Sequence, residues 1–264
     1  MLTTAVSSGM QGFPPALVVA PANDEIIGDR SATIAAPGRS ALGRLQPAQS
    51  AYPGATIAFY SADQEIIGEG DKAESYFKVV EGLFRAVKFT RDGRRQVFAF
   101  FGPGDMFGLD VDATHEATIE AVKPGALAIF SRSRIASATQ TDAGLAMTLF
   151  RGAAEALRRA VDHMTMIGRS SAVERVAWFL VDATTRFGRE FDGVAHCTLA
   201  MSRRDIADYL GLTIETISRA LAVLKQSGVI ALRSSREIEI RKLDLLRRLA
   251  AADRDDDAVN RLLA

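Results

Sequence analysis

Cysteine, tryptophan and histidine are scarce in this chain of 264 residues, which has one Cys, one Trp and three His. A single cysteine excludes an internal disulfide and any iron–sulfur cluster held by four thiolates of one chain. No apolar run is long enough to cross a bilayer, and residues 17–20 are too short for the apolar core of a signal peptide. We therefore expect a cytoplasmic globular protein that makes no contact with a membrane.

Patterns typical of catalytic or cofactor sites are also missing. The sequence shows no phosphate-cradling glycine loop, no paired zinc ligands and no nucleophile elbow. The Gly102-Pro103-Gly104-Asp105 segment is typical of a turn. We expect neither an enzyme nor a bound cofactor.

Net charge is absent as well, since 32 Lys and Arg balance 32 Asp and Glu. The balance hides an asymmetry along the chain, because residues 169–250 hold 14 basic and 10 acidic side chains. A basic C-terminal part beside an acidic remainder favours a polyanionic partner at the C-terminal end.

The stretch 202–228, SRRDIADYLGLTIETISRALAVLKQSG, predicts two helices joined by a tight turn. The first runs over Arg203–Leu210, with Ser202 as its N-cap and Gly211 at its left-handed end. The second runs over Ile214–Gln226 after the cap Thr213. An ordinary helical hairpin with a solvated polar face fits this geometry equally well.

The second helix has two different faces. Apolar side chains at spacings of three and four predict an inward face made of Ile214, Ile217, Leu221 and Leu224. Glu215, Ser218 and Arg219 follow the same spacings on another face. A carboxylate accepts from cytosine N4, a guanidinium forks onto guanine and a hydroxyl serves several bases, so this face is suited to reading DNA.

Two strand-like runs, 229–232 and 237–241, follow the helix pair and are joined by Arg233-Ser234-Ser235-Arg236. Helix, turn, helix and hairpin is the order of a winged helix-turn-helix. The segment MSRRDIADYLGLTIETISRAL resembles the DNA-binding signature of the CRP/FNR superfamily, and residues 214–219 are similar to its FNR and FixK branch. The resemblance implies that Glu215, Ser218 and Arg219 read the half-site TTGAT. Contacts to phosphate are expected from Ser202, Arg203, Thr213, Thr216, Arg233 and Arg236.

The middle of the chain has a different pattern, in which glycines separate short apolar runs. These runs are 57–60, 65–67, 76–80, 83–89, 96–101, 118–122 and 126–130. Many short strands at regular spacing predict an antiparallel roll. The segments YFKVVEG (76–82) and FGPGDMFG (101–108) resemble the cyclic-nucleotide-binding β-roll of the same superfamily.

Residues 143–167 predict one long helix between these two parts. Phe150, Ala154, Leu157, Val161 and Met164 alternate at spacings of four and three, as in a coiled-coil seam. The alternative is a helix buried inside one domain. The resemblance implies the dimerisation helix of a homodimer, with Phe150, Leu157, Val161 and Met164 at the interface.

These segments together predict an α+β fold with an N-terminal antiparallel β-roll, a long dimerisation helix and a C-terminal winged helix-turn-helix. We place a disordered extension at 1–48, the β-roll at 49–140 and the dimerisation helix at 141–168. The winged domain follows at 169–250, and a flexible tail takes 251–264.

The expected nucleotide cassette lacks the side chains that cyclic nucleotides need. In the cyclic-nucleotide relatives a Glu holds the ribose and an Arg holds the phosphate, whereas here Leu109 replaces that Glu and residues 108–129 contain no Arg. Four nearby carboxylates would instead repel a cyclic phosphate at close range; they are Asp110, Asp112, Glu116 and Glu120. We expect no cyclic nucleotide ligand.

Two further sensing chemistries stay open at this point. Cys197 is either a small buried side chain or a redox switch whose thiolate is favoured by His196 or Arg203. Some superfamily members bind haem through histidine, so His115, His163 and His196 leave open a regulator that responds to nitric oxide or carbon monoxide.

The sequence as a whole indicates a FixK-like transcriptional regulator that binds palindromic double-stranded DNA as a homodimer. The resemblance implies control of microaerobic, nitrogen-fixation or denitrification genes, and contact with RNA polymerase if the protein activates transcription. A rival from another class, an enzyme anchored to DNA by a winged helix, is disfavoured because the front half offers no catalytic group.

Overall fold

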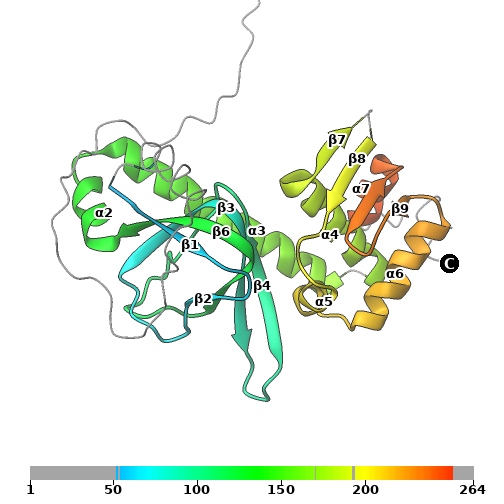
Figure 1. The fold of residues 1–264 in the computed structure, drawn as a ribbon, viewed down its shortest axis with the longest axis horizontal. Helices are drawn as coiled ribbons and strands as arrows, with labels where there is room; N and C mark the ends of the chain where they lie inside the picture. Colours follow the sequence, from blue (N-terminus) through cyan, green and yellow to red (C-terminus); the bar gives the residue numbers. More distant parts are fainter. Residues whose placement is uncertain (1–51, 53, 170, 192–193, 252–264) are drawn as a thin grey trace, which may run out of the picture.

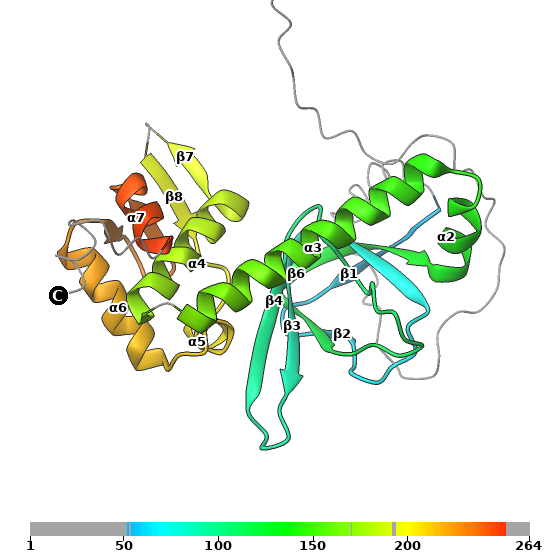
Figure 2. The same cartoon turned by 180° about the vertical axis from the view of Figure 1, so that it is seen from behind.

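The computed structural model describes residues 52, 54–169, 171–191 and 194–251. Two domains are joined by one long helix, α3 (Ala143–Arg169), which runs past the first domain and reaches the second (Figures 1 and 2). The extension predicted at 1–48 and residues 252–264 of the predicted tail lie outside the described residues. Among the residues described, no helix is long and apolar enough to span a membrane.

The N-terminal domain is an antiparallel β-roll. Its strands are β1 (Thr56–Tyr60), β2 (Glu65–Ile67), β3 (Ser75–Phe89), β4 (Arg95–Phe101), β5 (Met106–Phe107) and β6 (Thr118–Ser131). They pair in the order β1-β6-β3-β4, with β2 also on β6 and β5 also on β3. The β3–β4 hairpin is long and projects from the roll beside the second domain (Figure 1).

Two of the predicted turns are wrong, because runs 76–80 and 83–89 form the single strand β3 and runs 118–122 and 126–130 form β6. Gly82 and Gly125 lie where these two strands pair irregularly. A Cβ on Gly82 would lie 2.6 Å from the Gly125 Cα, so glycine is needed here for a close backbone approach.

Helices connect the roll to the second domain. The short α2 (Arg132–Thr139) was not predicted as a separate element, and α3 continues through Gly168 to Arg169. Next, α4 (Ala172–Phe187) begins at a capping box in which the Ser171 hydroxyl accepts from the Glu174 amide.

The C-terminal domain is a winged helix-turn-helix, as the sequence predicts. Its remaining elements are β7 (Arg189–Phe191), β8 (Val194–Thr198), α5 (Arg203–Leu210), α6 (Ile214–Gln226), β9 (Ile230–Leu232), β10 (Glu237–Ile240) and α7 (Leu243–Ala250). The strands pair in the order β7-β8-β10-β9. The predicted α+β fold class is confirmed.

The largest apolar core continues across the junction between the two domains. Leu83, Val87, Val97 and Phe100 of the β3–β4 hairpin are buried in the same cluster as the apolar side chains of α4, α5 and α6. The two domains therefore share apolar surface that would be exposed if they separated.

Candidate nucleic-acid interface

The helix-turn-helix is fixed by local hydrogen bonds at each end of its turn. Ser202 and Asp205 form a capping box at the start of α5, and Gly211 ends the helix with a left-handed φ of 62°. The Thr213 hydroxyl then accepts from the Thr216 amide at 3.2 Å and begins α6. Both helices have the bounds that the sequence predicts.

The inner face of α6 packs into the winged domain. Ile217, Leu221 and Leu224 are buried. Ile214 is 43 % exposed, so its prediction as an inward residue is wrong. It lies in the first turn of the helix, beyond the edge of the core.

The outer face of α6 presents Glu215, Ser218 and Arg219 together to solvent. Backbone hydrogen bonding at the helix start, the Thr213 hydroxyl and the charge of Arg219 hold the pKa of the Glu215 carboxyl below its usual range. The Ser218 hydroxyl donates to the Ile214 carbonyl at 2.9 Å, which leaves its oxygen free to accept. This face therefore offers one anion, one cation and one hydroxyl acceptor.

The wing is the β9–β10 hairpin, and its arginines have different surroundings. Arg233 forms an ion pair with Glu239 at 2.5 Å, and Arg241 pairs with the same carboxylate at 3.0 Å. Both guanidinium groups hold the pKa of Glu239 below its usual range, with the Arg241 hydrogen bond as the largest cause. Arg236 is exposed at the tip of the wing.

The remaining predicted phosphate contacts lie near the start of α5. The Arg203 Nη2 donates to the Ser235 carbonyl at 2.9 Å, so this side chain ties α5 to the wing, and burial lowers its pKa. The Ser202 hydroxyl lies 2.7 Å from the Asp205 carboxylate. Thr213 is exposed, and Thr216 is half-buried beside it.

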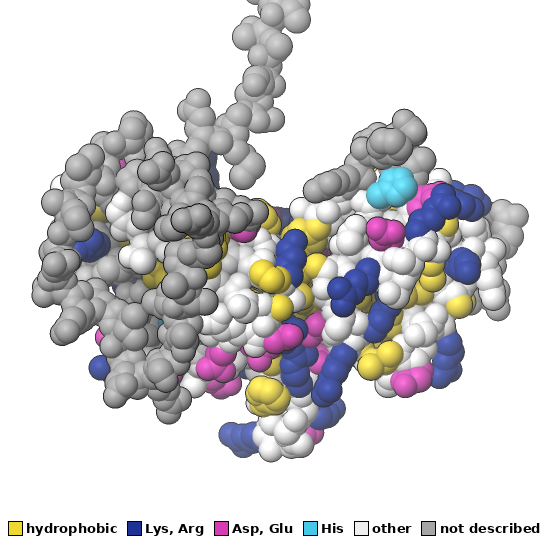
Figure 3. All heavy atoms as spheres, viewed as in Figure 1, with side chains coloured by type: hydrophobic (Ala, Val, Ile, Leu, Met, Phe, Trp, Pro, Cys, Tyr) yellow, Lys and Arg dark blue, Asp and Glu magenta, His cyan; other side chains and the backbone are white. Residues whose placement is uncertain are grey.

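Basic side chains gather over the winged domain and along the junction between the domains (Figure 3). The winged domain lies within residues 169–250, the part of the chain that is basic in sequence. A helix face with base-reading groups beside arginines is the arrangement that a DNA duplex requires.

Sequence comparisons place both domains in known families. Residues 57–142 match the cyclic nucleotide-binding domain, and residues 174–249 match the Crp-like helix-turn-helix domain. The nitrogen fixation regulation protein FixK of Azorhizobium caulinodans is 42 % identical over 77 % of this chain and 83 % of its own length. FixK of Rhizobium meliloti is 42 % identical over 73 % of this chain and 86 % of its own.

A structural comparison agrees with the sequences. The structure of FixK2 from Bradyrhizobium japonicum has a TM-score of 0.69 and 42 % identity, covering 74 % of this chain and 96 % of that one. This chain belongs to the FixK-like branch of the CRP/FNR superfamily. It is a DNA-binding transcriptional regulator.

In this FixK-like regulator the loop between β5 and β6, where the nucleotide cassette was expected, is held by hydrogen bonds from Arg132 and from its own His115. Arg132, the first residue of α2, donates to the Gly108 and Asp110 carbonyls at 2.8 and 2.7 Å. The Asp110 carboxylate lies 2.7 Å from His115 Nδ1, within hydrogen-bond distance. The hydrogen bond from His115 helps to hold the pKa of Asp110 low, against the effect of burial.

The four carboxylates that were expected to converge on the cassette do not converge. Glu120 pairs with Arg85 at 2.7 Å, and Glu116 lies 3.8 Å from Lys88. Asp110 and Asp112 are the two whose backbone carbonyls accept from Arg132. Repulsion of a cyclic phosphate is therefore weaker than the sequence indicates, while Leu109 still offers no carboxylate to a ribose.

The thiol of Cys197 is buried in the core of the winged domain, 1 % exposed. Burial raises its pKa to about 11, so the thiol is protonated at neutral pH. The expectation that His196 or Arg203 favours a thiolate is not met, and the geometry supports the alternative in which Cys197 is a packing residue.

Two of the three histidines are engaged inside the protein. His115 contacts Asp110, and His163 Nε2 lies 2.8 Å from the Tyr209 carbonyl oxygen while its ring stacks on the Tyr209 ring at 4.0 Å. Across the part of the chain that the structure describes, no group of three or more His, Cys, Asp or Glu side chains could hold a metal ion.

The side chains of the predicted coiled-coil seam of α3 are exposed to solvent in the single chain. Phe150, Leu157, Val161 and Met164 are 68, 66, 47 and 63 % exposed, and Met147 extends the same stripe. The alternative of a helix buried inside one domain is therefore excluded for this face of α3.

Some residues of the interface region could not be found from the sequence. Glu239 looks like an ordinary strand residue, yet it orients Arg233 and Arg241. Asp205 reads as a capping residue, yet it also pairs with Arg85 and Arg95 of the β-roll at 3.1 and 3.0 Å. Alternation along β10 could have drawn attention to Glu239, whereas no local signal marks the partners of Asp205.

Proposed function

We propose that this regulator acts in the cytoplasm as a homodimer that binds the inverted repeat TTGAT–N4–ATCAA. The observation that carries the proposal is the outer face of α6, where Glu215, Ser218 and Arg219 are exposed side by side. A two-fold dimer presents two such helices to successive major grooves about 34 Å apart, so its target is an inverted repeat.

Each reading group has a distinct role on the half-site. Arg219 forks onto the O6 and N7 of guanine, and Glu215 accepts from the N4 amine of the paired cytosine. Ser218 favours thymine at the outer part of the half-site, where its hydroxyl turns from the Ile214 carbonyl to donate to thymine O4. Arg236 at the wing tip contacts phosphate, and so do the groups at the start of the two helices.

The exposed stripe of α3 supports the dimer. Large apolar side chains at alternating spacings of four and three are the pattern by which two helices pack knobs into holes. Covering this stripe with the same stripe of a second copy removes it from water and sets the two-fold axis along α3.

Relatives support a role in gene activation. FixK proteins are named for the regulation of nitrogen fixation, and a transcriptional activator protein, FnrL of Cereibacter sphaeroides, is 32 % identical over 75 % of this chain. We propose that this chain activates microaerobic, nitrogen-fixation or denitrification genes and touches RNA polymerase at its promoters.

The test is a titration of Arg219→Ala against the operator, its single-base variants and random DNA at several salt concentrations. Losing one bidentate base contact costs about 1–3 kcal/mol per half-site and relaxes specificity at that base pair. Affinity for the operator should fall steeply, while affinity for random DNA stays nearly unchanged. If both fall equally and base preference persists, α6 is not the reading helix.

Arg236→Ala is the matched control, because it removes the same charge from the wing tip. Phosphate contacts carry no base information, so this variant should weaken binding to all sequences alike and lower the salt dependence by about one phosphate contact. A change of base preference in Arg236→Ala would assign part of the readout to the wing.

A further inference from the structure

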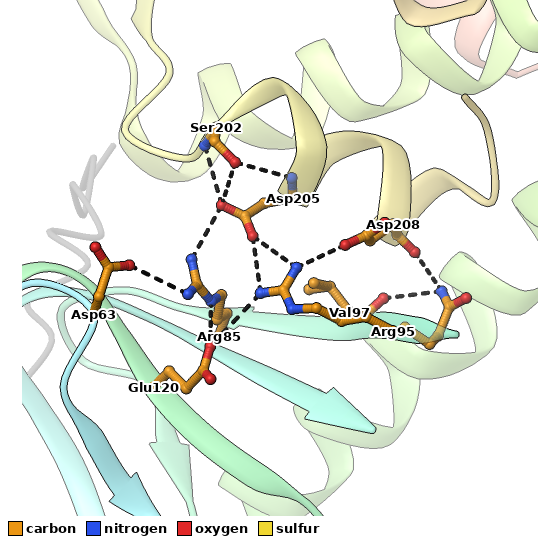
Figure 4. Close-up of polar contacts among 9 residues, drawn as sticks. Asp63, Arg85, Arg95, Val97, Glu120, Ser202, Asp205 and Asp208 are labelled. Carbon is orange, nitrogen blue, oxygen red and sulfur yellow. Dashed lines mark hydrogen bonds and ion pairs between the residues drawn. The ribbon is translucent and has the colours of Figure 1, made fainter. Parts of the chain in front are cut away.

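Six charged side chains join the β-roll to the first helix of the helix-turn-helix. We name them the junction cluster: Asp63, Arg85, Arg95, Glu120, Asp205 and Asp208 (Figure 4). Both arginines come from the β3–β4 hairpin, and both Asp205 and Asp208 come from α5. Arg85 reaches Asp205 at 3.1 Å, while Arg95 reaches Asp205 at 3.0 Å and Asp208 at 2.6 Å.

The junction cluster is shielded from water. The side chains of Arg85, Arg95 and Asp205 are only 12, 15 and 5 % exposed, and the Arg95 and Asp205 pair is held by two hydrogen bonds. Hydrogen-bonded charges at such depth are costly to separate, because each would be left partly buried without its counter-ion. The cluster therefore resists rotation of α5 relative to the roll.

Backbone groups of α5 are held from three other elements. Gln96 of β4 donates to the Asp208 carbonyl at 2.5 Å, and Arg175 of α4 donates to the Leu210 carbonyl at 3.1 Å. His163 of α3 contacts the Tyr209 carbonyl. Phe100 of β4 also packs edge-on against the Tyr209 ring at 5.1 Å. Thus α5 is fixed along its second half as well as at its start.

None of these contacts uses the face of α6 that carries Glu215, Ser218 and Arg219, which stays exposed. The arrangement that the junction cluster stabilises is therefore open to DNA. In a dimer built on α3, it also fixes the distance and angle between the two recognition helices, because each winged domain is fixed to a roll that α3 holds.

We propose that the junction cluster determines which half-site spacing this regulator accepts, with Arg95 and Asp208 as positioning residues. The inference rests on the proposed binding of an inverted repeat. Adding one base pair between half-sites moves the second half-site by about 3.4 Å and turns it by about 35°. Winged domains that are fixed to their rolls cannot follow that shift, whereas winged domains that can rotate relative to their rolls can follow it.

Rigidity also raises affinity for the matching operator. A protein whose binding-competent orientation is only partly populated binds more weakly in proportion to that population. Suppose that loss of the Arg95 contacts lowers the population of the orientation in which α5 is held against the roll to about a tenth. Affinity for the operator with the matching spacing then falls about tenfold, while affinity for operators with other spacings is unchanged or rises.

The experiment measures Kd for operators with N3, N4, N5 and N6 spacers, at one salt concentration, for the full-length chain and four variants. Arg95→Gln and Asp208→Asn break the contact from either side, and their combination tests coupling. Asp205 is left intact because it also caps α5. Arg94→Gln is the control, since it removes the same charge from an 81 % exposed neighbour on the same hairpin.

We expect the wild type to prefer N4. Arg95→Gln should bind N4 about tenfold more weakly and lose a similar factor of its preference over N3 and N5. Asp208→Asn should change in the same direction, and the double variant should lose less than the two single losses combined. Arg94→Gln should weaken all four operators alike and keep the preference.

Two outcomes would overturn the inference, and they are distinguishable. If the wild type discriminates among spacers and Arg95→Gln and Asp208→Asn discriminate equally well, the junction cluster has no role in spacing while the proposed function stands. If the wild type binds none of the operators better than random DNA, the proposed function fails and the inference fails with it.

Discussion

At the scale of single residues, His163 is a buried histidine at the contact between α3 and α5. It lies on α3, its ring stacks on the Tyr209 ring and lies 6.1 Å from the Trp178 ring, and it contacts the Tyr209 carbonyl. Burial lowers its pKa, and the hydrogen bond to Tyr209 and the charge of Asp182 only partly oppose that effect. The ring is therefore neutral in the folded protein at neutral pH.

This lowered pKa predicts a loss of stability in mild acid. Below pH about 6.5 the unfolded chain takes up a proton at this position while the folded chain does not. The free energy of unfolding therefore decreases as the pH is lowered, until the pH drops below the pKa of His163 in the folded protein. The loss is at most about 1.4 kcal/mol per pH unit. His163→Gln should remove it, as measured by urea unfolding between pH 5 and 7.

His196→Gln is the control, because it removes a histidine outside the stack. It should keep the acid-dependent slope of the wild type. An unchanged slope in His163→Gln would mean that carboxylates alone set the acid stability.

At the scale of elements, the irregular pairing of β3 with β6 depends on two glycines whose backbones approach each other. Gly82 has a φ of 103°, and a Cβ there would meet the Gly125 backbone at 2.6 Å. Because the obstacle is backbone rather than a flexible side chain, the strands would have to separate.

Gly82→Ala should therefore destabilise the roll by about 1–3 kcal/mol beyond the cost of its positive φ. Gly93→Ala isolates that backbone cost, of about 1 kcal/mol, since its φ is 79° and a Cβ there meets nothing within 4 Å. Thermal unfolding of both variants measures the difference. Equal losses of stability in the two variants would show that β3 and β6 can separate at Gly82 without cost.

Elements with local signals were predictable from the sequence, and contacts between distant residues were not. The caps Ser202 and Thr213 and the 3.6-residue period gave α5 and α6 with the observed bounds. Gly82 was misread as a turn because a glycine that permits close approach looks the same in sequence as one that permits a turn. Asp208 and Arg95 lie 113 residues apart, so no local pattern could pair them.

At the scale of the whole molecule, assembly should depend on the exposed stripe of α3. Leu157→Asp places a carboxylate at a residue that is 66 % exposed in one chain, so the fold of the chain should survive. Two buried carboxylates would meet across the two-fold axis at a large desolvation cost. Sedimentation should show monomers, and operator affinity should fall by more than tenfold as the second half-site contact is lost.

The control for assembly is Arg151→Asp, which puts the same carboxylate on an exposed position of α3 that lies about 120° around the helix from Leu157. It should remain dimeric. A Leu157→Asp protein that sediments as a dimer would move the interface away from α3.

The β-roll should not respond to cyclic nucleotides. Leu109 offers no carboxylate to a ribose, and the Arg132 guanidinium is already bonded to the carbonyls of the cassette loop. Millimolar cyclic AMP or GMP should change neither Tm nor operator affinity. A bound ligand at about a hundred times its Kd would stabilise the protein by about 2.7 kcal/mol, so a clear rise in Tm would contradict this prediction.

The single tryptophan lies where α3, α4 and α5 meet. Trp178 is 6.1 Å from the His163 ring and 6.4 Å from the Tyr209 ring, measured between centroids. Intrinsic indole emission of the protein therefore has one source, and that source is next to the contact between α3 and the helix-turn-helix. Without any added label, the protein carries an optical reporter of the orientation of its winged domain, usable in stopped-flow mixing with DNA.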